Sequence, residues 1–241
     1  MNIRWVLLFL LLYMIFSCTS DTKDIRNYYF PLKELTEGLV YEYQSVNNDT
    51  LAPDRWYYRS FVTDSAVYLT STYYDPVTLT PTQLMREEMV SNGMMVNNLY
   101  LFETDSTGKQ QQIEAQIIGG SIFPFEVRDS GGIFLFKTSW QSKAQNATYT
   151  LIKNRRYVGD TTFVFKNQRY DAVIFSIKEL IEQRQEGALE QQYSSTEWYA
   201  KGLGLVYYRK DVSPTFVLEY RLVDRYPMEQ LEGIFKQKLQ Q

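Results

Sequence analysis

From residue 39 onward, the chain consists of short segments in which apolar and polar residues alternate. The segments are rich in Tyr, Val, Thr and Phe, and clusters of Gly, Pro, Asn, Asp and Ser separate them. A period of two with this punctuation predicts half-buried β-strands. We expect strands over residues 39–46, 54–63, 66–74, 82–90, 95–104, 111–118, 122–127, 133–140, 147–158, 161–166 and 216–223.

The residues between these segments predict how the strands are joined. Asn92-Gly93 is the strongest hairpin signal and should connect the two strands on either side of it. Gly159-Asp160 predicts a second hairpin in the same way. Gly119-Gly120 should end a strand, and Pro124 indicates an edge or a bulge in the strand that follows.

One stretch, residues 171–193, fits two structures. Ile174, Ile177 and Ile181 have helical spacing, but apolar residues also alternate here, and Glu186-Gly187 could turn a long hairpin. We favour the hairpin, and the helix stays open as the alternative.

The last residues predict a short helix. It should start near Pro227 and place Met228, Leu231, Phe235 and Leu239 on one face. The rest of the chain has roughly a dozen predicted strands with short connections, too many for one flat sheet. We therefore expect an all-β, mainly antiparallel fold, in which a strongly curved sheet forms a half-barrel or barrel and a short C-terminal helix follows it.

The first residues have the layout of an export signal. Arg4 supplies a positive charge, and Trp5 to Phe16 is an uninterrupted apolar run. A helix across a bilayer needs about 20 apolar residues, so this run is short for a span. A basic start, a short apolar run and small polar residues are typical of a secretory signal. We expect residues 1–17 to be removed, residues 18–27 to form a solvated tether, and residues 28–241 to fold as one β-rich domain.

The apolar run ends in Ile15-Phe16-Ser17-Cys18. This sequence resembles the lipobox of bacterial lipoproteins, although Phe16 stands where a small residue is commoner. The resemblance implies that Cys18 is lipidated, with acyl chains such as palmitate, and that the protein is anchored in a membrane of the cell envelope. Because Asp does not follow Cys18, the resemblance further implies the outer membrane of a Gram-negative cell. The alternatives are a buried free cysteine and an ordinary signal peptide cut elsewhere.

Two further stretches resemble uncharacterised Gram-negative lipoproteins with a β-rich domain. Phe30-Pro31-Leu32, followed by Gly38 and Tyr41, is similar to their start, where an apolar plug precedes the first strand. Trp198 to Val206, with Ala172-Val173 before it, resembles a segment near the end of LolA-like half-barrel folds of periplasmic proteins and lipoproteins. The resemblance implies a fold and no activity. We expect the glycines of this segment to let a strand bend or a neighbouring backbone approach closely.

Composition excludes several kinds of chemistry. The chain has no histidine and a single cysteine, and its formal net charge is −3. Without histidine, it lacks Ser-His and Cys-His catalysis, most zinc sites and the usual general base near neutral pH. Mild acidity without a basic patch gives no reason to expect a nucleic-acid partner. Carboxylate, lysine or tyrosine chemistry and calcium binding stay open, but we expect no metal ion and no cofactor.

Aromatic residues are abundant, with 20 Tyr, 14 Phe and 4 Trp. Tyrosine suits half-buried strands, so most of these residues should build the core. The alternative is that some of them line a concave pocket for a lipid or a glycan. The candidates for this ligand-facing role are Tyr41, Tyr43, Trp56, Tyr58 and Trp198.

Paired carboxylates are the only candidates for catalysis. Glu87-Glu88 and Glu179 with Glu182 could supply a general acid and a base of the glycosidase kind. Neighbouring residues of a strand point to opposite faces, so Glu87 and Glu88 cannot share a site there. Solvated surface charge explains them more simply, and we assign no catalytic residue.

Four Asp-Ser or Asp-Thr pairs resemble the O-glycosylation sequon of one group of Gram-negative bacteria. The acceptors would be Thr50, Ser65, Ser106 and Thr161, all in expected turns. Such pairs are common in turns without any modification.

These observations predict a membrane-anchored envelope lipoprotein with a non-enzymatic binding or structural role. Its partner would be a lipid, a glycan or an envelope protein. The alternative is a carboxylate-dependent hydrolase that acts on envelope polysaccharide.

Overall fold

The computed structural model describes residues 22–105, 107–128 and 131–238. Its strands are β1 (Thr22–Asp24), β2 (Leu39–Ser45), β3 (Asp54–Val62), β4 (Val67–Tyr74), β5 (Pro81–Val90), β6 (Gly93–Thr104), β7 (Gln110–Pro124), β8 (Glu126–Arg128), β9 (Phe134–Ser142), β10 (Ala147–Phe165), β11 (Gln168–Arg184), β12 (Ala188–Ala200), β13 (Gly204–Ser213) and β14 (Phe216–Tyr226). A 3₁₀ turn, η2 (Arg26–Tyr28), follows β1, and the helix α2 (Met228–Lys238) ends the described chain.

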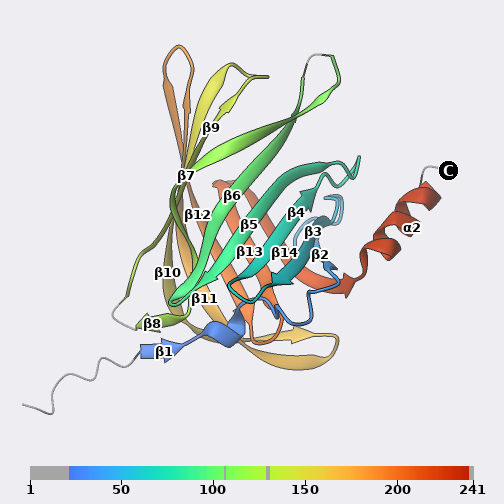
Figure 1. Ribbon diagram of the computed structural model, residues 1–241, viewed down its shortest axis with the longest axis vertical. Helices are drawn as coiled ribbons and strands as arrows, with labels where there is room; N and C mark the ends of the chain where they lie inside the picture. The colour runs from blue at the N-terminus through green and yellow to red at the C-terminus, as the bar shows by residue number, and fades with distance from the viewer. Residues whose placement is uncertain (1–21, 106, 129–130, 239–241) are drawn as a thin grey trace, which may run out of the picture.

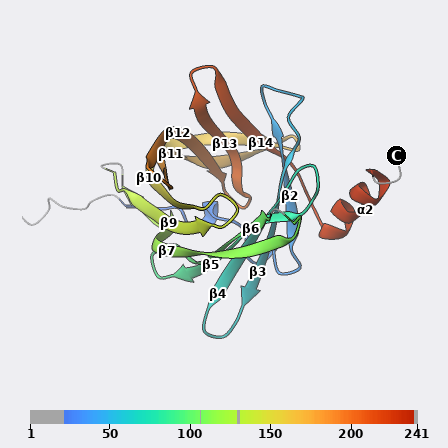
Figure 2. The ribbon, with the colours of Figure 1, turned by 90° about the horizontal axis from the view of Figure 1, so that it is seen from above.

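Twelve of the described strands form one closed antiparallel barrel (Figure 1). They follow one another around the barrel in chain order from β2 to β7 and from β9 to β14, and β14 pairs with β2 to close the ring. Figure 2 shows the ring of strands from above, with α2 outside it. The predicted all-β antiparallel fold with a short C-terminal helix is confirmed, and its sheet is a complete barrel instead of a half-barrel.

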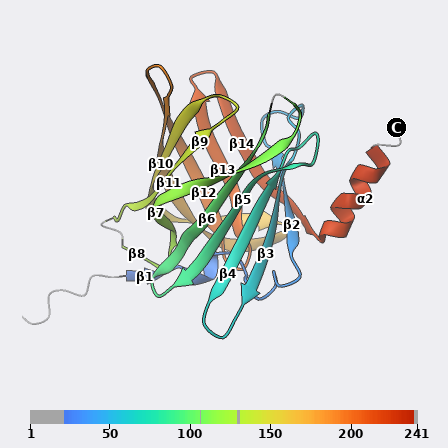
Figure 3. The same cartoon turned by 45° about the horizontal axis from the view of Figure 1, so that its top comes forward.

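The segment before β2 closes one end of the barrel, and we call residues 25–38 the plug. The Ile25 N–H donates to the Phe125 carbonyl at 2.8 Å, and the Gly202 N–H donates to the Asn27 carbonyl at 2.9 Å. The Ser60 N–H donates to the Leu35 carbonyl, also at 2.9 Å. The plug is thereby tied to strands on several sides of the barrel, and it lies at the lower end in Figure 3. We call the opposite end the mouth.

Apolar side chains fill the plugged half. Ile25 and Leu35 are fully buried, and Phe30 packs on Tyr58 with ring centroids 4.2 Å apart. Gly204 has φ +86°, and the Phe30 ring occupies the place where a Cβ at this position would lie. A glycine of this segment was expected to let a neighbouring backbone approach closely, but the group that approaches Gly204 is a side chain of the plug.

The folded part begins earlier than the expected tether of residues 18–27 allows. β1 pairs with β8, and Ile25 is in the core. The pairing of β1 with β8 brings Ile25 together with Phe125 and Val127 in one apolar cluster, and burial of their side chains stabilises this arrangement. Residues 18–21 lie outside the described residues, so for them the tether stays a prediction.

The hairpin predicted at Gly159-Asp160 is wrong. β10 runs through this dipeptide, which lies at a shift of the pairing register with β11. The turn instead uses Lys166 and Asn167, with φ 47° and 65°. A two-residue turn with positive φ at both residues, as at Lys166 and Asn167, matches the right-handed twist of the two strands it joins. Gly159 instead lies at a β-bulge, which a strand can contain without turning.

Gly119-Gly120 does not end a strand either. β7 continues through both glycines to Pro124, with a register shift against β9 between Ile117 and Gly119. A Cβ at Gly120 would lie 2.9 Å from the Val96 carbonyl oxygen, so the glycine allows a close approach of β6.

The strand predicted over residues 122–127 is divided at Phe125, because β7 ends at Pro124, beside a register shift against β6, and β8 begins at Glu126. Two predicted hairpins and the C-terminal helix are confirmed. Residues 171–193 form the hairpin of β11 and β12, and the strands around Asn92 form the hairpin of β5 and β6. The helix α2 packs Leu231 against Val40 and Tyr226 beside the barrel (Figure 1). Leu239, expected on the same face, lies outside the described residues. Within the described ranges, no helix is long and apolar enough to cross a membrane.

Candidate functional site

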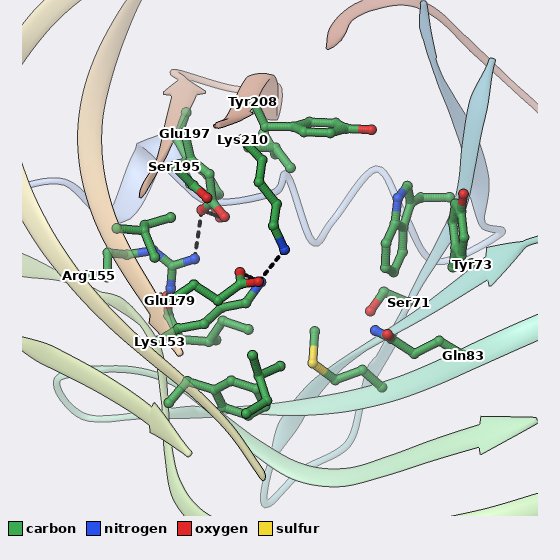
Figure 4. Close-up of a pocket in the computed structure, with 18 of the residues that line it drawn as sticks. Ser71, Tyr73, Gln83, Lys153, Arg155, Glu179, Ser195, Glu197, Tyr208 and Lys210 are labelled. Atoms are coloured by element: carbon green, nitrogen blue, oxygen red, sulfur yellow. Dashed lines mark hydrogen bonds and ion pairs between the residues drawn. The ribbon is translucent and has the colours of Figure 1, made fainter. Parts of the chain in front are cut away.

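The barrel interior holds a cavity of about 380 Å³ between the plug and the mouth (Figure 4). A barrel of twelve strands is wider than the eight-stranded kind that side chains fill on their own, so a hollow remains above the plug. The volume is within the range of roughly 300–1,000 Å³ typical of small-ligand pockets. Tyr29, Phe30 and Tyr199 are part of its lining and belong to the core that the plug completes.

Charged side chains line the cavity on β10, β11, β12 and β13, and we call them the charged wall. Its members are Lys153, Arg155, Glu179, Glu197 and Lys210. They face inward because they occupy alternate positions of their strands. Lys153 pairs with Glu179 and Arg155 with Ile177 across the β10–β11 ladder, so successive layers of charge run from the mouth toward the plug.

The deepest layer of the charged wall is a buried ion pair. Arg155 Nη2 lies 2.6 Å from Glu197 Oε2, and Arg155 Nη1 donates to the Ile122 carbonyl. The Tyr199 hydroxyl donates to the same Glu197 oxygen at 3.0 Å. Burial would raise the pKa of Glu197, but the charges of Arg155 and Lys153 outweigh it and hold that pKa below its usual value.

The layer nearer the mouth has two ammonium groups on one carboxylate. Lys153 Nζ lies 3.2 Å from Glu179 Oε2, and Lys210 Nζ donates to Glu179 Oε1. Burial opposes ionisation of Glu179, but the two lysines lower its pKa. The lysine side chains are 31% and 28% exposed, whereas Arg155 is 5% exposed. Solvent therefore reaches the cavity at the level of the lysines, and access falls toward the plug.

The opposite side of the cavity, on β3, β4 and β5, is largely uncharged, and we call it the aromatic wall. It consists of Trp56, Tyr58, Ser71, Tyr73, Gln83 and Met85. The rings of Trp56 and Tyr73 lie 4.9 Å apart. Figure 4 shows Ser71, Tyr73 and Gln83 across the open space from Lys153 and Lys210.

Two carboxyl groups accompany the aromatic wall. Glu87 is 2% exposed and accepts a hydrogen bond from the Tyr29 hydroxyl of the plug. Burial raises the pKa of Glu87 to about 7, although the Tyr29 bond and the Arg155 charge act in the other direction. Asp54 accepts from Tyr73 at 2.9 Å and from Tyr208, and burial raises its pKa.

Three buried polar atoms that line the cavity have no hydrogen-bond partner within the described part of the chain. They are Ser71 Oγ, Arg155 Nε and Ser195 Oγ. A buried polar atom without a partner costs roughly 1–3 kcal/mol. All three belong to residues that line the cavity, so their unused hydrogen-bonding capacity lies at its wall.

The five predicted ligand-facing aromatic residues have different places. Trp56 and Tyr58 line the cavity. Tyr41 and Tyr43 are fully buried in the core, where their hydroxyls donate to the Leu203 and Leu205 carbonyls. Trp198 alternates with the inward-facing Tyr199 and lies against Tyr207, with ring centroids 4.6 Å apart. A role in ligand contact stays a prediction for Trp56 and Tyr58, and the other three do not line this cavity.

The carboxylates chosen from sequence divide between the two faces. Glu87 and Glu179 face inward and are buried, so for them the interpretation as solvated surface charge is wrong. Glu88 bonds to Asn97, and Glu182 bonds to Arg184. In the described ranges, no group of three or more acidic or cysteine side chains is arranged to hold a metal ion.

Sequence reasoning misses most of the charged wall. Lys153, Arg155 and Glu197 look like exposed positions because both faces of β10 and β12 carry polar residues. The available signal is strand length. β10 and β11 have 19 and 17 residues, more than a half-buried surface strand of ordinary length.

The predicted modification sites lie away from the cavity. Thr50 and Ser65 are exposed in loops, whereas Thr161 lies within β10, opposite Ala172, and not in the expected turn. Ser106 and Cys18 lie outside the described residues. Glycosylation and lipidation therefore stay predictions.

Two solved structures are similar in fold to this chain. No family model and no curated protein matches the sequence. A protein proposed to be a lipoprotein from Parabacteroides distasonis is similar over 81% of this chain and 95% of its own, with 9% identity and a TM-score of 0.48. A protein proposed to be exported, with a YmcC-like fold, from Bacteroides fragilis matches over 77% and 92%, with 10% identity and a TM-score of 0.45. The likeness is distant, and the LolA-like relationship stays a prediction.

Proposed function

We propose that this protein is a bacterial envelope lipoprotein that binds a small amphipathic ligand inside its barrel without converting it. The observation that supports this most directly is the cavity between the charged and aromatic walls. Apolar lining residues such as Met85, Leu99 and Leu151 give affinity for an apolar group. Buried polar atoms without partners, such as Ser71 Oγ, can orient a polar group.

The proposal includes lipidation of Cys18, which the residues Ser17-Cys18 support. Three residues separate Cys18 from Thr22, the start of β1, and an extended chain gains at most ~3.6 Å per residue. The plugged end would then stay within ~15 Å of the lipid. The mouth would face away from the membrane, where a ligand from the periplasm or from outside the cell can enter. The outer membrane is the proposed location, since Thr19 and not Asp follows Cys18.

The second candidate is a carboxylate-dependent hydrolase, and one observation favours it. The environment raises the pKa of Glu87 to about 7 and lowers that of Glu197. Two carboxyls with separated pKa values can act as acid and base. Each is already held by a protein donor, Tyr29 or Arg155, which favours a fixed structural role.

The test is native mass spectrometry of the protein purified from its own envelope, together with incorporation of labelled palmitate. A retained non-covalent mass that organic solvent removes supports ligand binding. Label that is lost in Cys18→Ser supports the anchor. Release of sugar from envelope polysaccharide, lost in both Glu87→Gln and Glu197→Gln, would instead support the hydrolase. Protein that carries no ligand and binds no amphipath would contradict the proposal.

A further inference from the structure

The layer of the charged wall nearest the mouth carries more positive than negative charge. Glu197 is matched by Arg155 one layer deeper, so Glu179 is left to share its carboxylate between Lys153 and Lys210. Each ammonium group has three N–H donors, and Glu179 uses one of each. The two lysines therefore have donors left for a second anion.

A neutral donor lies beside these lysines. Ser195 pairs with Lys210 across the β12–β13 ladder, and its hydroxyl oxygen has no partner among the described residues. Figure 4 shows Ser195, Lys210 and Lys153 on the same side of the cavity. Two ammonium groups and a hydroxyl match the acceptor oxygens of a carboxylate or a phosphate.

Apolar side chains lie across from this group of donors. Trp56 and Met85 belong to the aromatic wall, and Leu99 pairs with Met85 on the next strand. A ligand held at the lysines would therefore meet an apolar surface with the rest of its length. A sugar, which presents hydroxyls on all sides, would leave these polar groups without partners, at a cost of roughly 1–3 kcal/mol for each buried hydroxyl.

We propose that the cavity takes a single-chain amphipath with one compact anionic head group, an inference that rests on the proposed function. Lys153, Lys210 and Ser195 receive the oxygens of the head group. The chain lies against Trp56, Met85 and Leu99. Glu179 keeps the lysines in place and competes with the ligand for them.

The test is titration calorimetry on the chain from residue 19 onward, whose closed barrel and core lie within the described residues. Dodecanoate represents a free fatty acid, monododecyl phosphate represents a phosphate-bearing lipid head, and dodecanol has the same chain without charge. We expect dodecanoate, the phosphate or both to bind at least roughly tenfold more tightly than dodecanol, since a charge-assisted hydrogen bond contributes that much or more. Whichever anion binds more tightly identifies the source of the head group.

Variants separate the head-group site from the cavity as a whole. Lys210→Met should weaken the binding of the anions roughly tenfold and leave the affinity for dodecanol unchanged. The buried Glu179 carboxylate is not left unpaired in this variant, because it keeps its ion pair with Lys153. Glu179→Gln should tighten anion binding, because it frees both lysines. The matched control is Lys178→Met, which removes an exposed lysine that bonds Ser194 across the neighbouring β11–β12 ladder, on the outer face of the barrel.

Two results would overturn this inference in different ways. The first is equal affinity for dodecanol and both anions, with no effect of Lys210→Met beyond that of Lys178→Met. This result would refute the preference for an anionic head group but would leave the proposed binding of an amphipath standing. No binding of any of the three would remove the amphipath site itself, and with it the proposed function.

Discussion

The plugged half and the mouth half of the barrel are built from the same strands but are stabilised differently. In the plugged half, Ile25, Phe30 and Leu35 fill the space that the strands leave, and the core is apolar and continuous. In the mouth half, ion pairs such as Arg155–Glu197 line a space that side chains leave open. In this barrel, the continuous apolar core is therefore at one end, and the cavity lined with charged side chains is toward the other.

Removing a ring from the plug should have the largest effect. Phe30→Ala should lower the free energy of unfolding by ~3–5 kcal/mol, because it leaves a cavity in the core. Urea unfolding followed by circular dichroism measures this loss. The control is Phe61→Ala on the outer face, 42% exposed, which should stay within about 0.5 kcal/mol. Equal losses in the two variants would show that the plug does not stabilise the barrel.

Breaking the deepest ion pair should have a somewhat smaller effect. Arg155→Met leaves Glu197 with Tyr199 alone and should cost about 3 kcal/mol, since it removes one partner of a buried pair. The double variant Arg155→Met with Glu197→Gln should recover much of this loss in the same urea experiment. A double variant as unstable as the single one would mean that Arg155 acts through packing and not through charge.

Glu87 lines the cavity and accepts a hydrogen bond from Tyr29 of the plug, and its titration should make the stability of the protein depend on pH. Its pKa is raised to about 7 from 4.5, so the folded state binds the proton more tightly than the unfolded state. The stabilisation is complete below pH 4.5 and is lost as the pH rises to about 7, by on the order of 3 kcal/mol.

The variant Glu87→Gln removes this titration and keeps an acceptor for the Tyr29 hydroxyl. Its melting temperature should equal that of the natural protein at pH 4.5 and exceed it at pH 8. A difference that does not change with pH would contradict the raised pKa.

An exposed ion pair near the plug should contribute least. Lys23 and Asp160 join β1 to β10, with side chains 34% and 58% exposed. Exposed pairs typically contribute up to ~1 kcal/mol, so Lys23→Met should change the unfolding free energy by less than that. A larger loss that disappears in 0.5 M salt, where the screening length is about 4 Å, would assign an electrostatic role to β1.

The same contrast explains what the sequence could predict. Alternation in β2, β3 and β4 is clear because Tyr41, Tyr58 and Leu69 are core residues, and these strands are correctly placed. The plug is also recognisable, from Phe30-Pro31-Leu32. The strand positions follow from burial alone, whereas the plug is recognisable only through the resemblance of these residues to the start of other lipoproteins.

The mouth half could not be predicted as well, for two physical reasons. A wide barrel accepts charges on its inner face, so Lys153 and Glu179 do not look different from outward residues. A strand can also contain a glycine at a register shift. The sequence around Gly159 therefore predicts a turn, although this residue is part of β10. Which positions face inward depends on closure of the ring, and no local pattern encodes that.

The most direct test compares two methionines in the chain from residue 19 onward, which contains no natural cysteine. Met85 lines the cavity, whereas Met94 is fully buried in the plugged half. In Met85→Cys, the thiol should react quickly with a small water-soluble thiol reagent, and dodecanoate should slow the reaction. In Met94→Cys, the thiol should react only as fast as the protein unfolds. Equal rates in the two variants would contradict a barrel that is filled at one end and hollow at the other.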